Sequence, residues 1–244
     1  MRLKDFNIVY QIARTELRVI FYSPVAWLIL VVFAVQCGFS FCDVIWPAIK
    51  SQSLGYEVQA LTGSVFTSGK GIFPVMLEHL YFYIPLLTMN MISRDLSGGT
   101  IKLLQSAPLR NAEIVLGKYL ALMIFGLAMM GVLLFYVLFG VCTIQNIDFP
   151  YVLTGMLGLY LLLCAYAAIG LFVSSLTSYQ VMAAFGTLFI LAMFNYVGGV
   201  WQDYEFVRDI TYWLSIRGRT EEFIYGLICS EDVLYFLIVI FLFL

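Results

Sequence analysis

Few side chains in this sequence have the types and spacing that covalent chemistry requires. The only histidine, His79, follows Glu78 in an otherwise apolar run. No serine–histidine arrangement, His-Glu-x-x-His motif or pair of aspartates within an apolar run is present. The five cysteines lie mostly in apolar stretches without metal-ligand spacing, which is typical of small buried side chains. We therefore expect no catalytic residue, no metal ligand and no cofactor bound by this chain.

One glycine-rich segment, residues 63–71, is superficially similar to a phosphate-binding loop. Such a loop has four residues between its glycines and a Ser or Thr directly after the lysine. Here five residues separate Gly63 from Gly69, and Gly71 follows Lys70. The spacing argues against nucleotide binding by this chain.

The composition is that of a membrane protein. Hydrophobic residues make up 62% of the chain and charged residues 11%, whereas soluble domains contain about 45–50% apolar and about 25% charged residues. Apolar blocks such as 25–46, 119–142 and 151–174 match the roughly 20 residues that cross a bilayer as a helix. The net charge of −2 provides no basic face, so we expect no nucleic-acid partner.

The apolar pattern predicts an all-α membrane protein that forms a single domain over residues 1–244. Six transmembrane helices are expected, at about 25–46, 72–92, 114–142, 151–174, 179–200 and 233–244. The last run reaches only about 18 Å as a helix, so either the sixth span begins earlier or the chain stops inside it. We expect a truncated C-terminus. A mixed polar and aromatic region, about 201–232, precedes this run.

An amphipathic helix is predicted at residues 5–21, ahead of the first span. Its apolar residues recur at helical spacing (Phe6, Val9, Ala13, Leu17 and Ile20). A cationic helix of this kind is typical of the membrane interface, and Pro24 turns the chain into the bilayer. Eight of the Lys and Arg residues then lie on one side, which favours a cytoplasmic N-terminus: Arg2, Lys4, Arg14, Arg18, Arg94, Lys102, Arg110 and Lys118. Lys118 lies near a span end, where its side chain can reach the interface.

Glycines in two of the spans allow other helices to approach closely. They are Gly126 and Gly131 in the third span and Gly155 and Gly158 in the fourth. The sequence alone does not distinguish packing against other helices of the same chain from packing against a second copy.

A second short helix is predicted between the second and third spans, just outside the bilayer. Gly98 and Gly99 break the preceding helix, and Thr100 has the hydroxyl to cap a new one. Pro108 ends that helix. Ile101 and Leu104 share one of its faces, and Lys102 and Gln105 lie on others.

This segment resembles the permease subunits of the type-2 ABC exporter superfamily, and within it the gliding-motility-associated permeases. The matching residues are Gly99, Thr100, Ile101, Leu103, Leu104, Ser106, Ala107, Pro108 and the run Glu113-Ile-Val-Leu-Gly-Lys118. Residues 22–26 and several positions between 223 and 236 are similar too. The family's paired-carboxylate cluster is reduced here to Arg94-Asp95-Leu96, and Lys102 replaces a commonly acidic residue.

The resemblance implies a permease without a catalytic site, which couples ATP hydrolysis by a separate cytosolic ABC ATPase dimer to export. ATP and Mg would bind that partner, and two permease copies, identical or paralogous, would pair in the lipid of a bacterial inner membrane. The short helix would be the coupling helix, with Asp95, Gly99, Thr100, Ile101, Leu103, Leu104, Ala107 and Pro108 as ATPase-coupling residues. Region 201–232 would re-enter the membrane as an outer gate that includes Glu221, Glu222 and Phe223.

Several alternatives stay open from the residues alone. The chain could be a non-transporting subunit that transmits ATPase strokes to an envelope machine for gliding or secretion, or a sensor without an ATPase. Glu78 and His79 near the outer end of the second span are candidates for a pathway, with a structural or interfacial role as the alternative. The aromatic residues of region 201–232 are equally typical of an interfacial belt.

Overall fold

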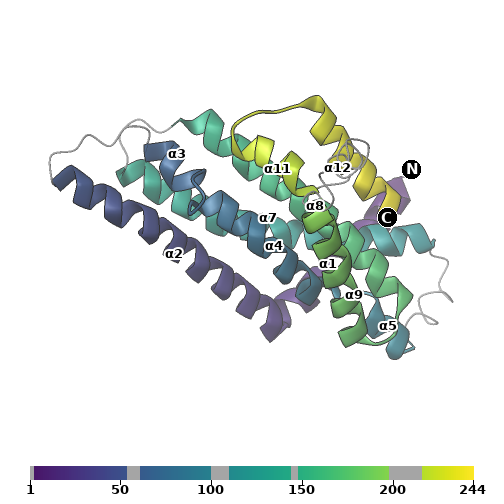
Figure 1. The fold of residues 1–244 in the computed structure, drawn as a ribbon. Helices are drawn as coiled ribbons and strands as arrows, with labels where there is room; N and C mark the ends of the chain where they lie inside the picture. The colour runs from purple at the N-terminus through teal and green to yellow at the C-terminus, as the bar shows by residue number, and fades with distance from the viewer. Residues whose placement is uncertain (1–2, 54–60, 100–109, 144–147, 198–215) are drawn as a thin grey trace.

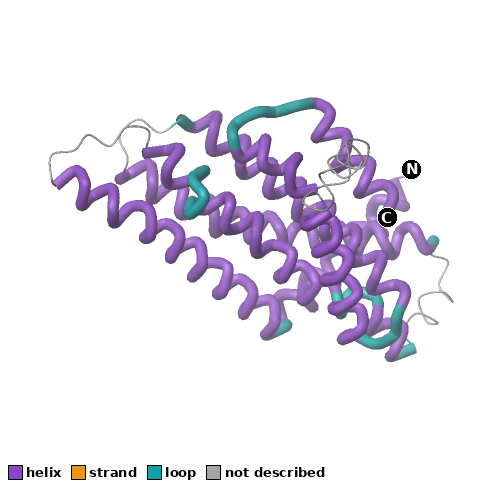
Figure 2. Tube along the Cα trace, viewed as in Figure 1, coloured by secondary structure: helices purple, strands orange, loops and turns teal. Residues whose placement is uncertain are grey.

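The computed structural model describes residues 3–53, 61–99, 110–143, 148–197 and 216–244, and within them all regular structure is helical (Figures 1 and 2). The helices are α1 (Leu3–Tyr22), α2 (Pro24–Ser53), α3 (Leu61–Phe66), α4 (Ile72–Thr88), α5 (Ser93–Ser97), α7 (Asn111–Thr143), α8 (Phe149–Leu176), α9 (Gln180–Tyr196), α11 (Ile216–Ile224) and α12 (Ser230–Phe243). The predicted coupling helix lies mostly in residues 100–109, outside the described residues, as does much of region 201–232.

Four of the described helical segments are long and apolar enough to cross a membrane: Pro24–Ser51, Ile72–Ser97, Asn111–Gly140 and Phe149–Leu176. They coincide with the first four predicted spans, which confirms the all-α membrane class. The fifth and sixth predictions fall on the shorter helices α9, with 17 residues, and α12, with 14. Helix α2 continues through Pro47 beyond the predicted end of the first span.

Helix α8 lies at the centre of the bundle. In its most apolar stretch 72% of the residues are buried, compared with 28% in α2. A Cβ atom added at Gly155 would lie 2.4 Å from the Phe73 ring, and one at Gly170 would lie 2.4 Å from the Thr88 hydroxyl oxygen. The two pairs have the same sequence separation, so α4 and α8 run parallel in constant register.

Close approach within the chain explains three of the four predicted packing glycines. Gly155 faces α4, Gly158 faces Phe223 of α11, and Gly126 faces Leu163 of α8. At Gly131 no described atom lies within 4 Å of a Cβ built there, so packing within the described residues does not explain this glycine and a seam between two copies stays open. Helical periodicity identifies small residues, but it does not show which of them has a neighbour.

The apolar stripe of α1 is buried against α7 and not free to face lipid. Val9, Ala13 and Ile20 are buried, and a Cβ at Gly117 of α7 would lie 2.6 Å from Ile12. The missing side chain at Gly117 thus lets the two helices come together. At the corner into α2, Trp27 Nε1 donates a hydrogen bond of 2.8 Å to the Phe21 carbonyl.

Replacing Gly158 with Val should destabilise the fold, because the Cβ of the new side chain would lie only 2.4 Å from Phe223 Cβ. Overpacking of this kind costs about 1–3 kcal/mol. Thermal unfolding of the purified protein in detergent measures the effect. Gly131→Val, which makes the same change where there is space, is the matched control, and equal melting temperatures for the two variants would contradict the packing described.

Candidate functional site

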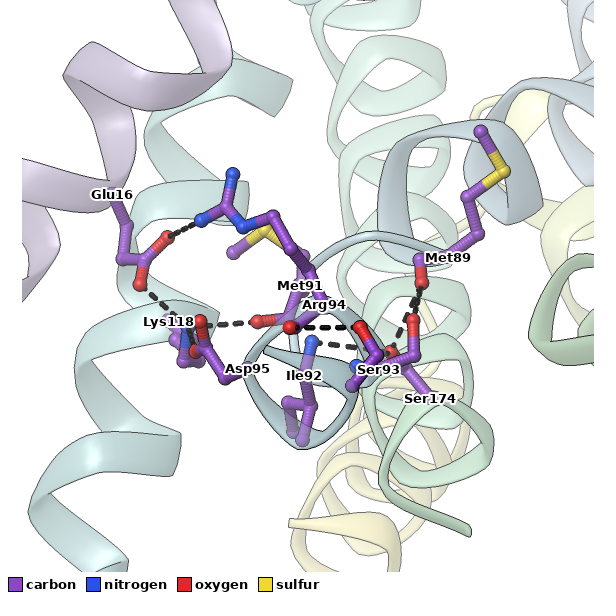
Figure 3. Close-up of polar contacts among 10 residues, drawn as sticks. Glu16, Met89, Met91, Ile92, Ser93, Arg94, Asp95, Lys118 and Ser174 are labelled. Carbon is purple, nitrogen blue, oxygen red and sulfur yellow. Dashed lines mark hydrogen bonds and ion pairs between the residues drawn. The ribbon is translucent and has the colours of Figure 1, made fainter. Parts of the chain in front are cut away.

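Four charged side chains meet where α1, α5 and α7 come together, and we call them the Lys118 cluster (Figure 3). Lys118 Nζ lies 2.7 Å from Asp95 Oδ2 and 2.5 Å from Glu16 Oε1. The same ammonium group donates a hydrogen bond of 2.7 Å to the Met91 carbonyl. At the edge of the cluster, Arg94 Nη2 lies 3.8 Å from Glu16 Oε2. Two carboxylates therefore balance two cations from three helices.

Lys118 is only 2% exposed, so its interfacial placement from the sequence is wrong. An ammonium group has three N–H donors, and here two carboxylates and one carbonyl accept them. This full set of acceptors makes burial of the charge tolerable. Removing one partner of a buried ion pair costs about 3–5 kcal/mol, because the other charge is left uncompensated.

A second set of contacts attaches the start of α5 to α8. The backbone N–H groups of Ile92 and Ser93 donate to Ser174 Oγ at 3.2 and 3.1 Å. Helix α5 has no capping side chain of its own, so Ser174 satisfies its unpaired N–H groups from a neighbouring helix. Through Ser174 and Asp95, the five residues of α5 are held by α8 on one side and by α7 on the other.

Of the predicted coupling residues, Asp95 and Gly99 belong to the described part of the chain and the other six do not. Asp95 is buried, and its carboxylate faces Lys118 rather than solvent. Gly99 has a φ of +70°, which suits glycine and ends the helix as expected. Thr100, Ile101, Leu103, Leu104, Ala107 and Pro108 lie outside the described residues. After that gap, the Arg110 N–H donates to Glu113 Oε2 at 3.1 Å and caps α7.

The predicted gate and pathway residues meet at the other end of α4. Arg217 of α11 lies 3.1 Å from Glu78 Oε1 and 3.0 Å from Glu221 Oε1. From the sequence, Glu78 was a pathway candidate and Glu221 a separate gate candidate. In the structure both carboxylates pair with Arg217. His79 accompanies Glu78 on α4, and its Nδ1 lies 2.7 Å from the Val75 carbonyl.

The other face of α11 is buried against α8 and α12. Phe223 is fully buried, and Arg219 lies 2.7 Å from Asp232 Oδ1 and stacks over Tyr235 at 4.6 Å. Glu222 lies near Cys229 in this corner. Because of these contacts, α11 has a fixed position over α8.

The register of α4 and α8 shows how deep Glu78 lies. Phe73 is level with Gly155, so Glu78 is level with Tyr160, about 16 Å along α8 from its first residue at 1.5 Å per residue. Helix α8 spans about 42 Å on the same rise, and Glu78 therefore lies near its middle.

Sequence reasoning missed the partners of these residues. Glu16, Ser174, Arg217, Arg219 and Asp232 were not candidates, and Lys118 was assigned to the interface. For the charged residues the sequence did contain an indication, because a charge close to an apolar run needs a counter-charge. It contained none for Ser174. The identity of each counter-charge depends on contacts between helices far apart in the chain.

Substituting Lys118 with Met should destabilise the protein by several kcal/mol, because the buried Asp95 carboxylate would lose its counter-charge and Glu16 would keep only the 3.8 Å contact with Arg94. Thermal unfolding in detergent is the measurement, and Asp95→Asn in the same chain should recover part of the loss. Arg94→Met is the control, because Arg94 is 43% exposed at 3.8 Å from Glu16 and such pairs contribute little. A Lys118→Met variant as stable as Arg94→Met would contradict the role of the Lys118 cluster.

Two comparisons with known proteins bear on the identity of the chain. A search of curated proteins found no match. The family model described as "ABC-2 family transporter protein" matches residues 10–203, which is well over half of the chain and includes the Lys118 cluster and α8. The chain belongs to the ABC-2 transporter family and is thus a multi-pass membrane permease component of an ABC transporter, a class that generally works with a separate ABC ATPase.

Proposed function

We propose that residues 1–244 form one permease domain of an ABC exporter of the gliding-motility-associated subgroup. Six spans cross a bacterial inner membrane, with the N-terminus in the cytoplasm, and α9 and α12 provide the fifth and sixth. Four long apolar helices and the family match support this topology, and so does the excess of Lys and Arg on the N-terminal side.

The observation that supports coupling most directly is the attachment of both ends of residues 100–109. Before this segment, α5 is held by Ser174 and by the Asp95–Lys118 ion pair. After it, α7 begins at the Glu113 cap and carries Lys118 itself. A force applied to the segment would therefore reach α1, α5, α7 and α8 through short polar contacts.

The coupling helix of residues 99–107 is then the ATPase contact. Closure of a cytosolic ABC ATPase dimer, which binds the ATP and Mg²⁺, pushes on this helix in each of two permease copies. Because Lys118 joins α1, α5 and α7, these helices move together as a rigid body. Asp95 acts here as a positioning residue, since its carboxylate is occupied by Lys118.

At the opposite end, α11 serves as part of an outer gate that re-enters the membrane. Glu221 and Glu222 are partly exposed on it, and Phe223 anchors it against Gly158. The Arg217–Glu78 ion pair connects this helix to α4, so a tilt of α4 would be transmitted to the gate.

Transport, rather than purely mechanical transmission, is favoured by a polar cavity between α4, α9 and α11. It has a volume of about 280 Å³, and Glu78, His79, Asn195 and Arg217 are among its lining residues. A subunit that only transmitted movement would need no polar cavity within its spans, where ionisable groups are costly.

The double substitution Ile101→Asp and Leu104→Asp should abolish association with the ATPase, because it places two charges on the apolar face of the coupling helix. The tagged chain is extracted gently from membranes, and co-purified ATP hydrolysis is measured. Lys102→Asp with Gln105→Asp puts the same groups on other faces and should retain the ATPase. Retention of ATP hydrolysis by the Ile101/Leu104 variant would show that this face is not the contact.

A further inference from the structure

The cavity between α4, α9 and α11 has features of a binding site for a small polar group. Its volume of about 280 Å³ is just below the roughly 300–1,000 Å³ of pockets that hold whole small molecules. It suits a head group better than a large ligand. Glu78 is level with the middle of α8 and its side chain is 52% exposed, so such a group would meet the carboxylate at the open side of the bundle.

Among the described residues, Glu78 and Arg217 are the charged groups that line this cavity, and Glu221, which pairs with Arg217 outside the lining, gives the group an excess of one negative charge. Arg217 is the cation, and Glu78 and Glu221 are both paired with it at 3.1 and 3.0 Å. One guanidinium cannot neutralise two carboxylates. The remaining charge favours a cation and disfavours an anion.

Two of the uncharged polar side chains that line the cavity already use N–H donors within the bundle. His79 Nδ1 lies 2.7 Å from the Val75 carbonyl, which can only accept, so Nδ1 carries a proton and donates to it. Asn195 Nδ2 donates to the Tyr166 hydroxyl at 2.7 Å and to the Leu191 carbonyl at 2.9 Å. Both amide hydrogens are thus used, which leaves the Asn195 carbonyl oxygen to accept.

Aromatic rings form the rest of the wall. Tyr81 lies against Phe82 with ring centroids 4.1 Å apart and meets Tyr196 edge-on at 6.5 Å. All three residues line the cavity. Aromatic faces attract cations, and a group of rings beside a carboxylate is an arrangement that recognises ammonium groups.

We propose that this cavity binds the ammonium group of an organic cation, with Glu78 as the counter-charge and Tyr196 and its neighbouring rings as the wall. The proposal rests on the proposed transport function and deepens it, because it names the chemical class of the substrate. An anionic substrate would face the surplus carboxylate, and a neutral one would leave that charge without a partner.

Choline is a suitable probe, because 3,3-dimethylbutan-1-ol has the same shape without the charge. Isothermal titration calorimetry of the full chain in dodecyl maltoside, which contains no ammonium group, should show saturable binding of choline and none of the alcohol. Glu78→Gln should weaken choline binding at least tenfold. Glu231→Gln removes an exposed carboxylate outside the cavity and should leave the affinity unchanged.

Tyr196 provides a second, independent test, because it is exposed and can be changed with little effect on folding. Tyr196→Leu should weaken choline binding several-fold, and Tyr196→Phe, which keeps the ring, should bind as the wild type does. The proposal is overturned if choline does not bind saturably, if the alcohol binds equally well, or if Glu78→Gln matches Glu231→Gln. Co-purification of the ATPase is measured on the same preparations. Loss of the ATPase would contradict the coupling function, whereas loss of choline binding alone would contradict the cation site.

Discussion

The buried ammonium group of Lys118 is the interaction on which the rest of the architecture depends. It is held by carboxylates from α1 and α5, and its own backbone belongs to α7. Such a charge is stable away from water only while all of its partners stay in place. The three helices are therefore fixed relative to one another on either side of residues 100–109. A displacement of one of them would also displace the other two.

Helix α8 extends this constraint to the other end of the molecule. Its small residues let α4 and α11 approach closely, at Gly155 and Gly158, and its Ser174 holds the start of α5. Because α4 keeps constant register along α8, the position of Glu78 beside Arg217 follows from the contacts near Ser93. The two charged regions thus lie at different levels of the same packed pair of helices.

Much of the fold could be predicted from local pattern. The apolar runs predicted the four long helices, the spacing of Val9, Ala13 and Ile20 predicted the buried face of α1, and the break at Gly99 was correct. The pattern could not show that α7 covers that face. Partners separated by 102 residues, as Glu16 and Lys118 are, or by 139, as Glu78 and Arg217 are, depend on tertiary packing that no local periodicity encodes.

If Lys118 couples the helices as described, α1 and α7 move as one body when the ATPase acts on residues 99–107. Spin labels on exposed positions 14 of α1 and 111 of α7, in a cysteine-free chain, report this directly by pulsed electron paramagnetic resonance. A second pair at 14 and 179 reports movement relative to the start of α9. Between the nucleotide-free and ATP-trapped complexes, we predict an unchanged 14–111 distance and a changed 14–179 distance. A change in the 14–111 distance would contradict the movement of α1 and α7 as one body.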